Sequence, residues 1–171
     1  MTRLVTIVLL LGGLLLTGCS AGTTDSSGTQ SADGSSAASL EFNATTISGD
    51  PFAGESLSGK PTVLWFWAPW CSACRNQAPG VSELATTYGD EVNVVGVGSL
   101  DESAAIEEFA DAVPADFTQL DDPDGAVWRH FGVTAQSTYL VLDADQNVVA
   151  SGYLSDADLD STVAGLAGLA G

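Results

Sequence analysis

Residues 61–75 read PTVLWFWAPWCSACR, a continuous apolar run that leads directly into a pair of cysteines. The run Pro61–Trp67 is rich in β-branched and aromatic residues, which is typical of a strand buried on both faces of a sheet. The residues from Cys71 to Tyr88 have the apolar spacing of a helix. Two cysteines at such a junction, Cys71 and Cys74, could form a redox pair, half of a metal site or a structural disulfide.

The third cysteine, Cys19, has its own explanation in the N-terminal sequence. Arg3 gives a short basic start, and the apolar run over residues 4–16 is shorter than the roughly 20 residues that a membrane-spanning helix needs. The run fits the hydrophobic region of a secretory signal. Residues 16–19, LTGC, resemble the lipobox of bacterial lipoproteins, in which the cysteine receives a diacylglyceryl group. We therefore expect residues 1–18 to be a lipoprotein signal peptide and Cys19 to be lipidated; the alternative is a plain signal peptide followed by a free thiol.

Residues 20–40 consist almost entirely of Ser, Gly, Ala, Thr and Asp, so they offer little apolar surface to bury. We expect residues 19–40 to comprise the lipidated cysteine and a flexible linker. The predicted location is the extracytoplasmic face of the bacterial cell membrane, lipid-anchored through Cys19. Disulfides persist in such a compartment, which favours a Cys71–Cys74 disulfide that forms and breaks.

Composition limits the partners of the chain. It has 4 Lys and Arg residues against 22 Asp and Glu residues, a formal net charge of −18. Such a surface repels phosphates, so we expect no nucleic-acid partner. Residues 41–171 have the length of one domain that can bury a core.

This domain alternates strand and helix patterns, in the order β-α-β-α-(α)-β-β-α, which indicates an α/β domain with a mixed sheet. After the first strand and helix, which Pro79 is expected to kink, we predict the following elements. They are a strand over Val92–Val97, a helix capped by Ser99 or Asp101 and ended by Pro114, a turn over Asp121–Gly125, a short helix over Ala126–Phe131, a hairpin of strands over Tyr139–Leu142 and Val148–Tyr153, and a final helix from a Ser155–Asp158 capping box to about Ala170.

A WCxxC motif between a buried strand and a helix, in this order of elements, resembles the thioredoxin fold. More narrowly, about residues 42–168 resemble the membrane-tethered and secreted branch that contains the TlpA, ResA and DsbE-like thiol-disulfide oxidoreductases. The supporting pieces are Gly59-Lys60-Pro61, FWAPWC at residues 66–71 with Cys74-Arg75 after it, Pro79, FGV at residues 131–133 and TYLVLD at residues 138–143.

The resemblance implies a thioredoxin fold, with a mixed central β-sheet flanked by helices on both faces. It also implies a membrane-tethered extracytoplasmic thiol-disulfide oxidoreductase that exchanges disulfides with exported proteins carrying thiols or disulfides. A membrane redox partner would reset the pair. At a helix start, Cys71 is favoured as the thiolate that attacks, and Cys74 would resolve the mixed disulfide. The expected substrate-binding rim comprises Pro69, Trp70, Gln136 and Ser137.

Three residues depart from the family pattern. Trp65 stands where many thioredoxins have a buried Asp, and Gln77 stands where tethered members often have a Glu. The usual proton acceptor for Cys74 is therefore missing. Ser137 occupies the place of a proline expected in cis, so it must hold a strained cis bond or, as we expect, rebuild the loop. Its hydroxyl could donate a hydrogen bond to a thiolate.

Other functions predict other residues. A copper chaperone would need a histidine with its cysteines, and we expect the single histidine, His130, to lie on a solvated face. A peroxiredoxin would have Thr at the position of Ala68. A non-catalytic binding domain stays open because of the three departures. We expect no metal ion and no cofactor, and the direction of electron flow is not predicted.

Overall fold

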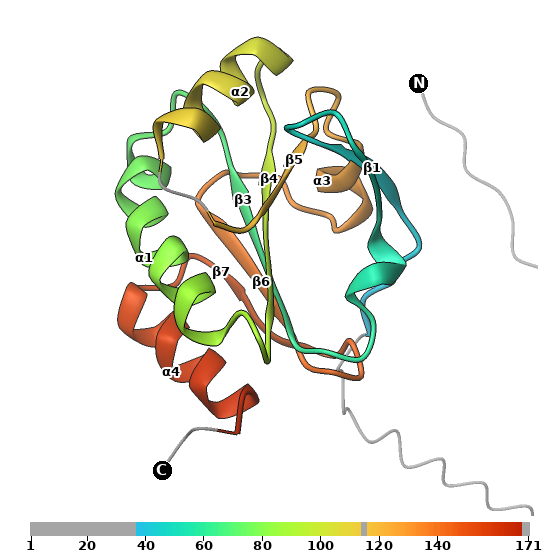
Figure 1. The fold of residues 1–171 in the computed structure, drawn as a ribbon, viewed down its shortest axis with the longest axis vertical. Coiled ribbons are helices and arrows are strands. Elements are labelled where there is room, and N and C mark those ends of the chain that lie inside the picture. The colour runs from blue at the N-terminus through green and yellow to red at the C-terminus, as the bar shows by residue number, and fades with distance from the viewer. Residues whose placement is uncertain (1–36, 114–115, 169–171) are drawn as a thin grey trace, which may run out of the picture. The chain divides into compact units, whose positions relative to one another are not determined.

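The computed structural model describes residues 37–113 and 116–168, which form one mixed sheet with helices on both of its faces (Figure 1). The strands are β1 (Asn43–Thr46), β2 (Pro51–Ala53), β3 (Thr62–Trp67), β4 (Asn93–Gly98), β5 (Thr118–Asp121), β6 (Thr138–Leu142) and β7 (Val148–Gly152), and the helices are α1 (Ser72–Tyr88), α2 (Ser103–Ala112), α3 (Ala126–His130) and α4 (Asp156–Leu166), with a 3-10 turn over Gly54–Leu57.

The sheet has the strand order β2-β1-β5-β4-β3-β6-β7. Strands β3, β4 and β5 are parallel, whereas β6 runs antiparallel to β3 and β7 antiparallel to β6. Side chains of β3 alternate between two apolar clusters: Trp65 and Trp67 pack with α1, α2 and α4, and Leu64 and Phe66 pack with α3. The expected thioredoxin fold is confirmed.

Strand β3 positions the cysteine motif. All of its residues are buried, as the continuous apolar run predicts, because neighbouring strands pair with it on both sides and helices cover both faces. The chain leaves β3 at Trp67 and starts α1 at Ser72, so the motif lies at the carboxyl end of the strand. Pro79 lies inside α1.

Three strands were missed by the sequence prediction. Strand β5 is short, and Asp121, which we assigned to a turn, is its last residue. Strand β2 forms one edge of the sheet and β1 lies between β2 and β5; both are short and carry few apolar side chains, so they lack the apolar run of a buried central strand.

Two helix ends also differ from the prediction. Helix α2 starts after Glu102, without a side-chain cap, because the Ser99 hydroxyl donates instead to the backbone oxygen of Asp122 at 2.6 Å. Asp101 accepts a bond from the N–H of Glu102, one residue before the helix. The predicted Ser155 cap of α4 is confirmed, but α4 ends at Leu166.

The folded part includes residues that we assigned to the end of the linker. Ala37 pairs with Asn147, and the side chain of Leu40 is only 4% exposed. Leu40 is the apolar residue that anchors this segment to the cluster under α3. The predicted signal peptide and Cys19 lie outside the described residues. No helix within residues 37–113 and 116–168 has the length and apolarity needed to cross a membrane.

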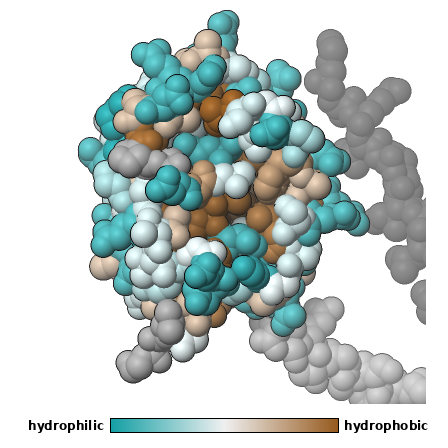
Figure 2. Space-filling view, in the orientation of Figure 1, coloured by the Kyte–Doolittle hydropathy of each residue, from teal (hydrophilic) through white to brown (hydrophobic). Residues whose placement is uncertain are grey.

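Hydrophilic residues predominate on the face shown in Figure 2, around a hollow where apolar residues gather. One cavity of about 690 Å³ is lined by the beginnings of β4 and β5, among them Asn93 and Thr118. Because the cysteines follow the carboxyl end of β3, this cavity lies at the opposite end of the parallel strands.

Candidate active site

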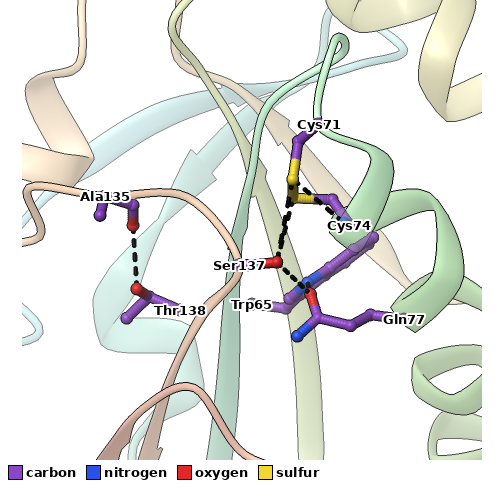
Figure 3. The surroundings of a disulfide bond; sticks show 7 residues. All are labelled: Trp65, Cys71, Cys74, Gln77, Ala135, Ser137 and Thr138. Atoms are coloured by element: carbon purple, nitrogen blue, oxygen red, sulfur yellow. Dashed lines mark hydrogen bonds between the residues drawn. A yellow bond between two sulfur atoms is a disulfide. The ribbon is translucent and has the colours of Figure 1, made fainter.

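Cys71 and Cys74 form a disulfide at the start of α1, with their Cα atoms 5.3 Å apart (Figure 3). Cys71 is the N-cap of the helix, with extended backbone dihedrals. The backbone N–H of Cys74 donates to the Cys71 sulfur over 3.1 Å. The first turn of a helix has free N–H groups and a positive dipole end, so this position favours a thiolate on Cys71 once the disulfide is reduced.

The two sulfur-bearing residues differ in access. Cys71 is 6% exposed, whereas Cys74 is 0% exposed. A substrate sulfur can therefore approach Cys71 but not Cys74. This asymmetry fits the predicted roles, with Cys71 in contact with substrate and Cys74 acting from inside.

Two rim residues precede the disulfide. Trp70 is 58% exposed, and its indole N–H donates to the backbone oxygen of Leu100 over 3.2 Å. That bond fixes a large apolar side chain at the surface next to Cys71. Pro69 is half-buried beside it. With α2, the two residues line a hollow of about 290 Å³.

Arg75 belongs to the wall of this hollow rather than to the sulfurs. Its guanidinium carbon lies 5.0 Å from the centre of the Phe109 ring, within the range of a cation–π contact. Phe109 in turn stacks on Trp67, with ring centres 4.5 Å apart. Arg75 is thus tied to α2 through an aromatic pair.

Ser137 approaches the disulfide from the loop before β6. Its φ is +64°, in the left-handed region, so the loop has a form that proline, with φ near −65°, does not adopt. Its hydroxyl oxygen lies 3.8 Å from the Cys71 sulfur and 3.6 Å from the Cys74 sulfur. Gln136, the other expected rim residue of this loop, is half-buried.

The three departures from the family pattern meet in one place. The indole N–H of Trp65 donates to Gln77 Oε1 over 3.0 Å, and the Ser137 hydroxyl lies 3.2 Å from the same oxygen (Figure 3). We call these residues the Trp65–Gln77–Ser137 network. All three side chains are uncharged, and Gln77 is 5% exposed. The sequence names each residue but not the contact, because Gln77 and Ser137 are 60 positions apart.

His130 lies too far from the two cysteines to bind a metal ion together with them, because it is on the other side of the sheet. The ring of His130 packs against Phe42 on the α3 side of the sheet, and its Nε2 lies 2.7 Å from the backbone oxygen of Ser39. Cys71 and Cys74 belong to the cluster on the other side. Within residues 37–113 and 116–168, no three His, Cys, Asp or Glu side chains are grouped as metal ligands would be.

Known proteins agree with this geometry. Residues 35–151 match the model of the AhpC/TSA family. The soluble secreted antigen MPT53 of Mycobacterium tuberculosis is 42% identical over 106 residues, which are 62% of this chain and 61% of that protein. The match thus spans less than two thirds of this curated relative.

Two solved structures have the same fold. The structure of MTB DsbF, in mixed oxidised and reduced forms, is 47% identical with a TM-score of 0.70, covering 74% of this chain and 96% of that one. A secreted Mycobacterium tuberculosis disulfide oxidoreductase, described as homologous to E. coli DsbE, is 37% identical with a TM-score of 0.68, covering 74% and 97%. The chain therefore belongs to the AhpC/TSA family and, within its thioredoxin-like proteins, to the group that includes the DsbE-like thiol-disulfide oxidoreductases.

Proposed function

We propose that this protein is a membrane-tethered, extracytoplasmic thiol-disulfide oxidoreductase that acts on exported proteins through Cys71 and Cys74. One observation carries the proposal: the two cysteines form a disulfide at the start of α1, with the outer sulfur accepting a helix N–H. The DsbF and DsbE-like relatives support the same activity.

The exchange needs only the two sulfurs and a substrate disulfide. In the reduced protein, the Cys71 thiolate attacks one substrate sulfur, forms a mixed disulfide and releases the other substrate sulfur as a thiolate. Cys74, once deprotonated, then attacks the Cys71 sulfur, re-forms the Cys71–Cys74 disulfide and releases the second substrate thiolate. The substrate gains two electrons, the pair loses two, and the released thiolates take protons from water. The reverse sequence oxidises a substrate dithiol.

The surface around Cys71 suits an unfolded or extended polypeptide. The exposed Trp70 offers an apolar contact, and the hollow beside it combines Phe109 with the acidic side chains of Asp101 and Glu108. Such a surface would bind apolar segments and disfavour acidic ones.

Activity is tested by following insulin reduction by the reduced protein with dithiothreitol as electron donor. We expect the wild-type chain to accelerate precipitation of the insulin B chain, and Cys71→Ser to lose essentially all of the acceleration because no mixed disulfide can form. Full activity in Cys71→Ser would contradict the proposal. Copper binding by the anaerobically reduced protein at one ion per chain, without reductase activity, would instead favour a metal chaperone.

Membrane tethering rests on residues 16–19 and is tested separately. Lipidation of Cys19 after signal cleavage would hold the domain at the extracytoplasmic face, where exported substrates and a membrane redox partner meet it. Cys19→Ser should move the protein from the membrane fraction to the soluble fraction or the medium. Retention of Cys19→Ser in the membrane fraction would rule out the lipid anchor without affecting the proposed chemistry.

A further inference from the structure

The Ser137 hydroxyl lies between a buried sulfur and a buried amide. Its oxygen is 3.6 Å from Cys74 Sγ and 3.2 Å from Gln77 Oε1 (Figure 3). Cys74 is fully buried, so water does not reach its sulfur from outside. A thiolate on Cys74 would therefore depend on the protein for a hydrogen-bond donor.

The direction of the bonds in the Trp65–Gln77–Ser137 network follows from the chemistry of the groups. The indole nitrogen of Trp65 can only donate, so the Gln77 atom 3.0 Å from it is the oxygen, which can only accept. The hydroxyl of Ser137 must then donate its single proton to that oxygen while the cysteines are oxidised. Neither sulfur of a disulfide carries a proton to offer in return.

Reduction changes what Ser137 faces. As a thiol, Cys74 can donate its S–H to the hydroxyl oxygen, which continues to donate to Gln77. As a thiolate, Cys74 is a stronger acceptor than an amide oxygen, and the hydroxyl can turn its proton to the sulfur by rotating about the Cβ–Oγ bond. The Trp65 bond keeps the Gln77 oxygen in place in both cases.

We propose that Ser137 is a catalytic residue whose hydroxyl stabilises the Cys74 thiolate as it resolves the mixed disulfide, and that Gln77 and Trp65 are positioning residues for it. This inference rests on the proposed exchange reaction, of which it describes the second step. An uncharged network thus stands where the family has a buried acid; it stabilises the anion, whereas the Cys74 proton passes to water or to the released substrate thiolate.

Other ionisable groups around Cys74 do not supply the same effect. Burial raises the pKa of Tyr139 on β6, so this phenol stays neutral over the range where thiols titrate. The negative charge of Asp156, at the start of α4, raises the pKa of Tyr139 further. Arg75 on α1 and Glu108 on α2 line the hollow beside Trp70.

The proposal predicts a characteristic pH profile. A donor to the thiolate lowers the pKa of Cys74 but also lowers its nucleophilicity, with a Brønsted coefficient of roughly 0.4–0.5. For about a tenfold change in thiol ionisation, the hydroxyl should speed resolution about threefold below the pKa and slow it about threefold well above it. Loss of the hydroxyl should therefore give a profile that crosses that of the wild-type chain.

The step can be observed with dithiobis(nitrobenzoate) as the substrate disulfide. In a Cys19→Ser background only Cys71 and Cys74 can react, because the chain has three cysteines. Attack by Cys71 releases the first coloured thiolate and leaves a mixed disulfide. Attack by Cys74 on the Cys71 sulfur releases the second, so stopped-flow absorbance reports resolution directly at each pH.

Two variants remove the hydroxyl in different ways. Ser137→Ala keeps a Cβ at φ +64°, whereas Ser137→Gly also removes any backbone strain. The matched control is Thr138→Val, which removes a hydroxyl that donates to the backbone oxygen of Ala135 in the same loop (Figure 3). We expect both Ser137 variants to cross the wild-type profile as described and Thr138→Val to follow it.

Several results would overturn the inference. These are an unchanged profile in both Ser137 variants, an effect in Ser137→Ala but not in Ser137→Gly, or an equal effect in Thr138→Val. A wild-type chain that releases no second coloured thiolate would overturn the proposed exchange itself, which keeps the two failures distinct. Trp65→Phe should shift the profile in part, because it removes the hydrogen bond that holds Gln77 Oε1 in place.

Discussion

Ser137 shows how one residue changes both the backbone and the chemistry beside a disulfide. With φ at +64°, its backbone is in a region that L-residues other than Asn and Asp seldom adopt. A proline introduced at Ser137 would have to rebuild the loop, since its ring fixes φ near −65°. In its present conformation the loop brings the hydroxyl of Ser137 within 3.6 Å of Cys74 Sγ.

Gln77 offers a test of what an acid would do at this place. Gln77→Glu puts a carboxylate where the amide oxygen lies, and a negative charge next to Cys74 should raise the pKa of its thiol. The second release of coloured thiolate should then be slower near neutral pH by about tenfold or less, with one additional titration in its pH profile. Stopped-flow measurement as above checks both features.

Asn76→Asp is the matched control for this charge. Asn76 is the neighbouring residue on α1, and it is exposed. The substitution changes the net charge equally but leaves the new carboxylate in water, where its effect is screened. An equal shift of the profile in both variants would mean that total charge, and not the network, sets the rate.

For the site, the sequence predicts which residues take part better than it predicts which of them are in contact. The roles proposed for Cys71 and Cys74 follow from their spacing and from the helix start, both of which are local. The contact between Gln77 and Ser137 depends on the loop before β6 folding over α1, and no local pattern encodes it. The three departures therefore looked like separate losses in the sequence, although in the structure they form one network.

At the scale of the elements, the buried central strands and long helices are predictable because their side chains repeat with a clear period. The short strands β1 and β2 are not, since strand pairing rather than an apolar pattern defines them. Short α3 is placed by Asp122, a residue that we assigned only to a turn. Its carboxylate accepts the backbone N–H groups of Val127 and Trp128, each over 3.1 Å.

Asp122 also predicts a pH dependence of stability. Burial raises its pKa above the ordinary value of about 3.9, although the N–H bonds oppose the shift. The folded state therefore binds this proton more tightly, and the resulting stability is present below the ordinary pKa and lost as the pH rises through the folded pKa. Relative to wild type, Asp122→Asn should gain unfolding free energy as the pH rises from about 3.5 to 7.

Asp143→Asn provides a comparison of opposite sign. Hydrogen bonds from Asn147 hold the pKa of Asp143 below its usual range, so its contribution is present above the ordinary pKa and lost as the pH falls through the folded pKa. This variant should lose stability relative to wild type as the pH rises. Urea unfolding at several pH values measures both differences, and slopes of the same sign would contradict the assignment.

At the scale of the whole molecule, we expect the net charge to determine which charged substrates approach the disulfide readily. With a net charge of −18, the protein attracts cations and repels anions over a distance set by ionic strength, about 10 Å at 0.1 M salt. Added salt should slow exchange of the reduced protein with cystamine and speed exchange with glutathione disulfide. Hydroxyethyl disulfide, which is neutral, is the control; the same response for all three would exclude an electrostatic cause.

The pairing of Ala37 with Asn147 has a geometric consequence for a tethered protein. Asn147 lies between the end of β6 and the start of β7, whereas Ser137 directly precedes β6, whose first residue pairs with Phe66 near the carboxyl end of β3. A linker attached before Ala37 therefore joins the domain at the end of the sheet opposite the disulfide. A strand of 6 residues such as β3 is roughly 20 Å long, and about this distance separates the attachment point from the disulfide. An anchor on Cys19 would thus be attached to the domain at the end away from the disulfide, and a flexible linker would leave the reactive sulfur free to meet passing polypeptides.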